Sequence, residues 1–103
     1  MKRKIYNTLE EVIEPSLGID IVNLGLVYEV CIKEDNDVQI VMTTTSGDSF
    51  LAEVIAKEVK RILKQKLTIL RNIDINIVTS PRWSADKMTR YAWYALELQP
   101  LQN

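Results

Sequence analysis

The sequence predicts a small α/β fold of the α+β type, in which a three-stranded mixed sheet packs against helices. Three segments alternate apolar and polar residues, and three others repeat apolar residues at helical spacing, in the order α-β-β-α-β-α. The 103 residues, 47% of them hydrophobic, are enough to bury one core without disulfide or metal staples. We therefore expect a single domain over residues 1–103.

The first helix is predicted over residues 2–13, because apolar side chains recur on one of its faces. Pro15 and Gly18 follow and end the segment. Thr8 and Glu11 also match a capping box, which leaves the first residue of this helix open.

Two strands are predicted over residues 26–32 and 38–42 from their alternating hydrophobicity. Asp35 and Asn36 between them suit a two-residue turn, so the strands are expected to form an antiparallel hairpin. A third strand, over residues 73–77, is reached through a helix. That connection favours a parallel arrangement with the second strand.

The longest helix is predicted over residues 48–66, with Asp48 or Ser49 as its N-cap. A basic cluster lies on this helix and just after it. Its simplest interpretation is a solvated helix face whose cations complement the helix dipole, and the other is a docking patch for a partner. The cluster comprises Lys57, Lys60, Arg61, Lys64, Lys66 and Arg71.

A third helix is predicted from Ser84, the natural N-cap, with Asp86 in its first turn and with Trp83 and Met88 as a hydrophobic staple. Its expected inward stripe follows helical spacing. The stripe comprises Met88, Tyr91, Ala92, Ala95 and Leu96.

Two aromatic side chains of this helix, Trp93 and Tyr94, lie outside the expected stripe. Surplus aromatics on an outer face favour contact with a client or with a second copy in a homodimer. The other interpretation is that they fold back under the tail at residues 99–101.

Three loops are expected to meet at one end of the sheet. The second strand ends in a turn at residues 43–49, the third ends at residues 79–83, and the first begins after residues 23–25. Because the first strand is antiparallel to the second and the third is parallel to it, these ends coincide. The candidate functional surface comprises Asp20, Asn23, Thr44, Thr45, Asp48, Arg82, Trp83 and Ser84.

The composition excludes several classes of chemistry. The chain has no histidine, which removes imidazole acid–base catalysis and the commonest zinc sites, and we expect no enzymatic activity. Its single cysteine, Cys31, cannot form an internal disulfide, and no signal-like apolar run begins the chain, so a cytoplasmic location is expected. A net charge of -1 and the absence of a long apolar run argue against nucleic acid and membranes as partners.

Weaker interpretations stay open beside these. Asp48 is first of all an N-cap, and a ligand or partner contact is its second interpretation. Asp20, Asp48 and Asp86 could gather round a hard divalent ion, although carboxylates without a dense ligand run are a weak signal. Basic and aromatic residues that would suit single-stranded nucleic acid, against the net charge, are Arg82, Trp83, Arg90, Tyr91 and Trp93.

Three ordered motifs carry a family resemblance. Residues 15–28 read Pro-x-Leu-Gly-Ile-Asp-Ile-Val-Asn-Leu-Gly-Leu-Val-Tyr, residues 42–45 read Met-Thr-Thr-Thr, and residues 81–88 read Pro-Arg-Trp-Ser-x-Asp-x-Met. Together they resemble the small iron–sulfur assembly family that includes SufT-like and PaaD-like proteins, over nearly the whole chain. The resemblance implies a small α/β domain and an auxiliary factor in iron–sulfur cluster assembly or delivery.

The chain departs from that family at one turn, which usually reads Thr-Thr-Pro-Gly-Cys-Pro. Asp48 stands here at the cysteine, and Gly47 at the glycine. A carboxylate is a harder ligand than a thiolate, so no stably bound cofactor is expected, and a cluster only transiently. Cys31 lies about 20 Å from the site along its strand, at roughly 3.3 Å per residue, and does not easily substitute.

The resemblance implies the assembly machinery or apo client proteins as partners. Because Asp48 replaces the thiol, an adaptor without its own stable cluster is the first interpretation. The second is a carrier of iron or a cluster that uses Asp48 together with partner ligands. A third is a binding module outside iron–sulfur metabolism.

Overall fold

The structure is a computed structural model that describes residues 1–98. Two short 3-10 turns, η1 and η2, join the regular helices and strands. The elements, in order, are α1 (Lys2–Leu9), β1 (Ile13–Glu14), β2 (Ile19–Asp20), β3 (Val27–Ile32), η1 (Glu34–Asn36), β4 (Val38–Met42), α2 (Ser49–Lys66), β5 (Ile73–Ile77), η2 (Ala85–Lys87) and α3 (Arg90–Leu98). The predicted α+β class is confirmed.

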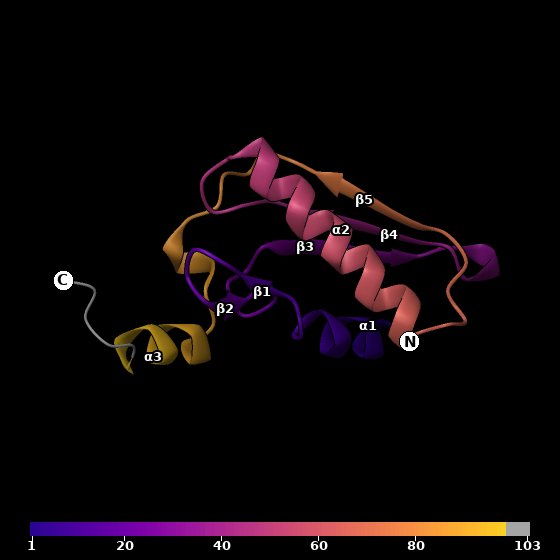
Figure 1. The fold of residues 1–103 in the computed structure, drawn as a ribbon, viewed down its shortest axis with the longest axis horizontal. Helices are drawn as coiled ribbons and strands as arrows, with labels where there is room; N and C mark the ends of the chain where they lie inside the picture. The colour runs from indigo at the N-terminus through magenta and orange to yellow at the C-terminus, as the bar shows by residue number, and fades with distance from the viewer. Residues whose placement is uncertain (99–103) are drawn as a thin grey trace.

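The described chain is elongated, with extents of 49 × 24 × 21 Å. In Figure 1, α2 runs diagonally across the three-stranded sheet, and α3 lies at one end of the long axis, beyond β1 and β2. Among residues 1–98, no helix has the length and apolar character needed to cross a membrane.

The main sheet has the order β3-β4-β5. Its first pair is antiparallel and its second pair is parallel, as the sequence predicts. Val30, Ile40 and Ile73 are buried and belong to the core, whereas Cys31 and Asp74 alternate with them and are exposed. The sheet therefore has one face in the core and one open face.

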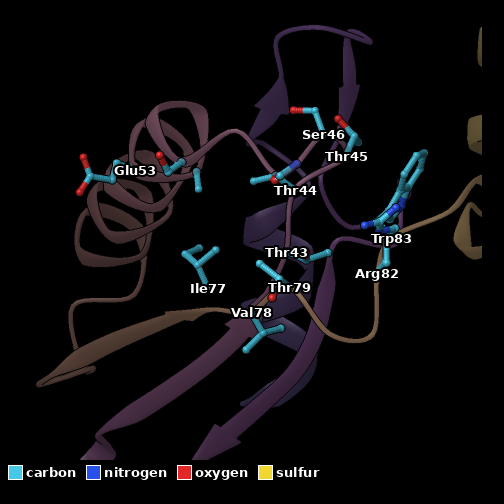
Figure 2. A pocket seen from close by; sticks show the side chains of 13 residues that line it. Thr43, Thr44, Thr45, Ser46, Glu53, Ile77, Val78, Thr79, Arg82 and Trp83 are labelled. Atoms are coloured by element: carbon cyan, nitrogen blue, oxygen red, sulfur yellow. The ribbon is translucent and has the colours of Figure 1, made fainter.

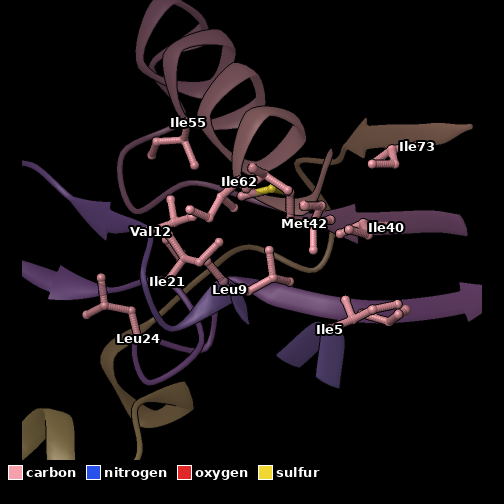
Figure 3. Packing of buried hydrophobic residues seen from close by; sticks show 14 of the residues in the cluster. Ile5, Leu9, Val12, Ile21, Leu24, Ile40, Met42, Ile55, Ile62 and Ile73 are labelled. Atoms are coloured by element: carbon pink, nitrogen blue, oxygen red, sulfur yellow. The ribbon is translucent and has the colours of Figure 1, made fainter. Parts of the chain in front are cut away.

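One apolar cluster connects the elements. Figure 3 shows side chains of α2, such as Ile55 and Ile62, beside Val12 and Ile21 from the first quarter of the chain. Met42 and the sheet residues close the cluster on its other side. The segment after α1 thus belongs to the core rather than to a surface loop.

The hairpin between β3 and β4 forms as predicted, but its loop is one residue longer. Lys33 N donates to Asp37 O at 2.7 Å, so residues 34–36 form the loop. Asp35 and Asn36 both have positive φ, 61° and 62°, a conformation that asparagine and aspartate tolerate better than most residues.

The predicted helix over residues 2–13 is wrong in length, because α1 ends at Leu9. β1 then pairs with β2 in a small antiparallel sheet, which the sequence pattern does not reveal. Thr8 is not a cap, since its hydroxyl donates to Lys4 O at 2.8 Å within the helix. The short pairing wins because the turn between β1 and β2 is held by the side chain of Glu14, described below.

The predicted start of the third helix at Ser84 is also wrong. Ser84 precedes the short turn η2 and makes no side-chain capping bond, and α3 begins only at Arg90. Thr89 takes the capping role, because its Oγ1 accepts from Ala92 N at 3.2 Å. Met88 has extended backbone angles and separates the two helical turns.

Two side-chain predictions for α3 need correction as well. Trp83 and Met88 form no staple, because no helix starts at Ser84. In the predicted inward stripe, Ala92 is fully buried, but Tyr91 is 59% exposed. The predicted fold-back under residues 99–101 lies outside the described residues.

Candidate functional site

A pocket of about 580 Å³ opens at the end of the sheet where β4 and β5 finish and α2 begins. In Figure 2 the threonines after β4 lie between Glu53 of α2 on one side and Arg82 with Trp83 on the other. The lining residues are Thr43, Thr44, Thr45, Ser46, Gly47, Ser49, Ala52, Glu53, Ile77, Val78, Thr79, Arg82 and Trp83.

Half of the predicted surface lies in this pocket. Thr44, Thr45, Arg82 and Trp83 line it. The predicted loops at residues 43–49 and 79–83 therefore meet at this pocket. The remaining four predicted residues lie outside the lining: Asp20, Asn23, Asp48 and Ser84.

The wall after β4 is a turn whose backbone donors are satisfied locally. Thr44 Oγ1 accepts from Gly47 N at 3.0 Å. Asp48 is the N-cap of α2, as predicted, and its Oδ1 accepts from Phe50 N at 2.9 Å and from Leu51 N at 3.1 Å. Asp48 thus satisfies two of the free backbone donors at the helix start and places a negative charge there, so the turn is a poor anion site.

The cap gives a direct prediction. Asp48→Ala is expected to lower the unfolding free energy by about 1 kcal/mol, because two backbone donors lose their acceptor. Asp48→Ser and Asp48→Asn keep an acceptor and are expected to cost much less. Urea denaturation of the three variants measures the difference, and an alanine variant as stable as the parent would contradict the capping role.

The opposite wall is held to the first third of the chain by two side-chain-to-backbone hydrogen bonds. Trp83 Nε1 donates to Leu24 O at 2.6 Å, and Tyr28 Oη donates to Pro81 O at 2.8 Å. Burial raises the pKa of Tyr28 above the ordinary value for a phenol, which is itself well above neutral pH, and the hydroxyl is therefore the donor. Lys87 Nζ lies 5.3 Å from the centre of the Tyr28 ring, within cation–π distance.

Asp20 and Asn23 support this wall from behind. Asp20 Oδ2 accepts from Asn23 N at 2.9 Å, and Asp20 Oδ1 accepts from Asn23 Nδ2 at 2.8 Å. Asn23 Oδ1 in turn accepts from Thr89 Oγ1 at 2.7 Å, and Asn23 O accepts from Thr89 N at 2.9 Å. The predicted polar pair thus anchors the segment at residues 81–89, which we call the anchored segment.

Gly25 lets the anchored segment approach closely. Its φ is +80°, and a Cβ placed there would lie 2.3 Å from Lys87 O. Ser84 plays a local part, since its Oγ donates to Asp86. This hydrogen bond lowers the pKa of the Asp86 carboxyl. The motifs at residues 15–28 and 81–88 are therefore halves of one packed contact.

Sequence reasoning missed two kinds of residue. Thr79 and Glu53 line the pocket, and the spacing of Glu53 one helical turn after Ser49 is the signal that could have found it. Glu14 is fully buried, and its carboxyl accepts from Ser16 Oγ at 2.5 Å and from Leu17 N at 2.7 Å. Nothing in the hydrophobic pattern marks a buried acid.

The pocket offers hydroxyl groups, the carboxylate of Glu53, one guanidinium and one indole, but no thiol. Cys31 is exposed on β3 and pairs with Gln39, three residues and about 10 Å before the end of β4, so it lies nearer the pocket than the roughly 20 Å expected from the sequence, although outside its lining. Within residues 1–98, no three or more His, Cys, Asp or Glu side chains gather in a way that could hold a metal ion. Fold and site together define a small α+β domain with a thiol-free pocket at the strand ends.

The chain belongs to the iron-sulfur cluster assembly protein family, whose sequence profile matches residues 2–76. It is 46% identical over 99 residues to the Fe-S protein maturation auxiliary factor YitW of Bacillus subtilis, a match that covers 96% of each chain. It is 44% identical to the Fe-S protein maturation auxiliary factor SufT of Staphylococcus aureus, over 82% of this chain and 96% of that protein.

A solved structure shows the same fold. The crystal structure of a domain of unknown function, DUF59, from Bacillus anthracis superposes with a TM-score of 0.90 at 43% identity. The superposition covers 94% of this chain and 92% of that one. The arrangement of helices and sheets in Figure 1 is therefore the arrangement of a solved relative.

Proposed function

We propose that this protein is a cytoplasmic, non-enzymatic auxiliary factor in the maturation of iron–sulfur proteins, and that it acts as an adaptor without a stable cluster of its own. Family membership and the names of its relatives support the process. One observation carries the adaptor mechanism: an acid, Asp48, caps the helix at the turn where the family places a thiol, and Cys31 lies elsewhere.

Exposed aromatic side chains support the adaptor role. On α3, Trp93 is 46% exposed, Tyr94 is 60% exposed and Tyr91 is 59% exposed, and aromatic side chains of this kind often anchor protein contacts. A client protein, the assembly machinery or a second copy of this chain would use them.

A second candidate is a carrier that binds iron or a cluster briefly through Asp48. One observation favours it: both capping bonds reach Oδ1, which leaves Oδ2 of an exposed carboxylate to face solvent. A lone carboxylate would need further ligands from a partner, since iron–sulfur clusters are normally held by several cysteines.

Anaerobic reconstitution with iron and sulfide separates the two candidates. The adaptor is expected to leave a desalting column without stoichiometric iron or sulfide, because its one thiol lies outside the pocket and clusters are normally held by several cysteines. Asp48→Cys is the matched control and is expected to retain more iron than the parent. A parent protein that emerges brown, with iron and sulfide in equal amounts, would refute the adaptor mechanism.

The same proposal is tested in cells that lack this protein. Cys31→Ser removes every thiol from the chain. It is expected to restore the activity of iron–sulfur enzymes as well as the parent does. Failure of Cys31→Ser at equal protein level would assign the thiol a chemical role. No restoration by the parent itself would refute the maturation role.

A further inference from the structure

A second hollow lies between α2 and the segment at residues 11–15, which contains β1, and it shares no lining residue with the pocket of Figure 2. It encloses about 610 Å³. Its apolar part includes Pro15 and two side chains that face solvent, Ile13 at 52% and Val54 at 44% exposure. We call it the β1–α2 groove. Exposed aliphatic side chains gathered in a hollow, rather than scattered, are typical of a contact surface.

Two acids and two cations line the groove, but the ion pairs within residues 1–98 leave one of these cations without a partner. Its two acids are already paired: Glu58 with Arg61 at 2.6 Å, and Glu11 with Lys66 at 3.5 Å. Lys57 lines the groove and makes no ion pair with any residue of the described chain.

The positive charge continues from the groove along α2. Lys60 and Lys64 are exposed and, like Lys57, have no ion-pair partner among residues 1–98. The positions of these three lysines, i, i+3 and i+7, place them on one side of α2 over about 10 Å, roughly two helical turns. The three lysines form what we call the lysine stripe.

We propose that the β1–α2 groove and the lysine stripe dock an acidic amphipathic helix of a partner protein, an inference that rests on the proposed adaptor function. Apolar side chains of that helix enter the groove over Ile13 and Val54. Its carboxylates meet the lysine stripe, whose two-turn length matches a helix lying alongside α2. The partner is thus recognised by an apolar face bordered by acids.

A second copy of this chain does not supply such a helix. The residues of α1 include three cations and no acid, and α2 carries the lysine stripe itself. α3 contains a single acid, Glu97, among nine residues. No helix among residues 1–98 therefore has the acidic amphipathic character that the groove requires, which favours a different protein as the occupant.

The test uses a fluorescent synthetic peptide of about 14 residues, long enough for a short helix, with leucines on one face and glutamates elsewhere. The triple variant Lys57→Glu, Lys60→Glu and Lys64→Glu is expected to bind it at least about tenfold more weakly by anisotropy. The control variant changes the same charge elsewhere, with Lys33→Glu, Arg71→Glu and Arg90→Glu, and is expected to keep most of the affinity. Equal losses in both variants would overturn the docking site.

The apolar half of the proposal has its own variant. Val54→Asp is expected to abolish peptide binding, whereas Ile69→Asp, at a residue that is 56% exposed outside the groove, is expected to leave binding unchanged. Thermal melting establishes that both variants fold. Unchanged binding by Val54→Asp would overturn the groove as the docking site. So would a single-stranded oligonucleotide that displaces the peptide, or a dimer of the parent that Val54→Asp dissociates.

Maturation in cells separates this inference from the function on which it rests. Loss of iron–sulfur enzyme activity with the lysine-stripe variant, but not with its charge control, supports the docking site. Full activity with a variant that no longer binds the peptide overturns the docking site and leaves the adaptor function standing. Failure of the parent to restore activity refutes the adaptor function, whatever the peptide does.

Discussion

Gly25→Ala is expected to lower the unfolding free energy by about 3 kcal/mol, a large effect for the addition of one methyl group. At φ +80° the backbone is in the left-handed region, which is unfavourable for alanine because of its Cβ. Its methyl group would also lie 2.3 Å from Lys87 O, a backbone atom that cannot rotate away. The anchored segment must move, and Trp83 moves with it.

Gly47→Ala is the matched control for this prediction. Gly47 has φ +75°, but a Cβ there meets no atom within 4 Å, so only the conformational cost applies, about 1 kcal/mol. Chemical denaturation gives both values, and tryptophan fluorescence reports whether the indole of Trp83 becomes exposed. Equal losses for the two alanines would show that the contact with Lys87 carries no weight.

The second large effect is expected at Glu14, whose side chain is fully buried. Glu14→Ala is expected to cost about 3 kcal/mol, because the N–H of Leu17 and the hydroxyl of Ser16 lose their acceptor, and a cavity replaces the carboxyl. The turn between β1 and β2 depends on these two contacts. Thermal melting is expected to show a drop of roughly 12 °C or more for a domain of this size.

Two further variants, Glu14→Gln and Ser16→Ala, separate the contribution of the charge of Glu14 from that of its hydrogen bonds. Glutamine keeps one carbonyl oxygen that can accept from Leu17 N. Its amide N–H can donate to the hydroxyl oxygen of Ser16, which rotates to accept, so most of the stability should remain. Ser16→Ala removes one bond at an exposed residue and is expected to cost about 1 kcal/mol or less. A glutamine variant as unstable as the alanine variant would show that the charge of Glu14, and not its hydrogen bonds, is what matters.

The main sheet and α2 could be predicted because their patterns are long and regular. Residues such as Val30 and Ile40 alternate with polar neighbours, and α2 repeats apolar residues over 18 positions behind a strong cap at Asp48. Local sequence and tertiary packing agree there. The parallel pairing of β4 with β5 follows from the helical crossover between them.

The two ends of the described chain could not be predicted because long-range contacts override the local pattern. Ser84 looks like a better cap than Thr89, yet Asn23 holds Thr89 by two hydrogen bonds across 66 positions of sequence. That anchoring keeps Met88 extended and delays α3 to Arg90. After α1, the side chain of Glu14 stabilises a turn that the spacing of apolar residues does not predict.

The candidate site could be predicted only in part, because some of its residues are placed by sheet topology and others by long-range hydrogen bonds. The strand ends gave Thr44, Thr45, Arg82 and Trp83, because topology alone brings those loops together. Asp20 and Asn23 are polar residues near the same end of the sheet, and only the hydrogen bonds to Thr89 show that they lie behind the pocket wall. The functional role of these residues remains a prediction.

The hydrogen bond between Trp83 and Leu24 spans 59 positions of sequence, so this wall of the pocket can form only after most of the chain has been synthesised. During synthesis, the loop at residues 20–25 leaves the ribosome long before the anchored segment that closes over it. Contacts of such large sequence separation also form slowly during folding. A nascent chain therefore lacks the complete pocket until the anchored segment has been synthesised and has packed against the loop at residues 20–25.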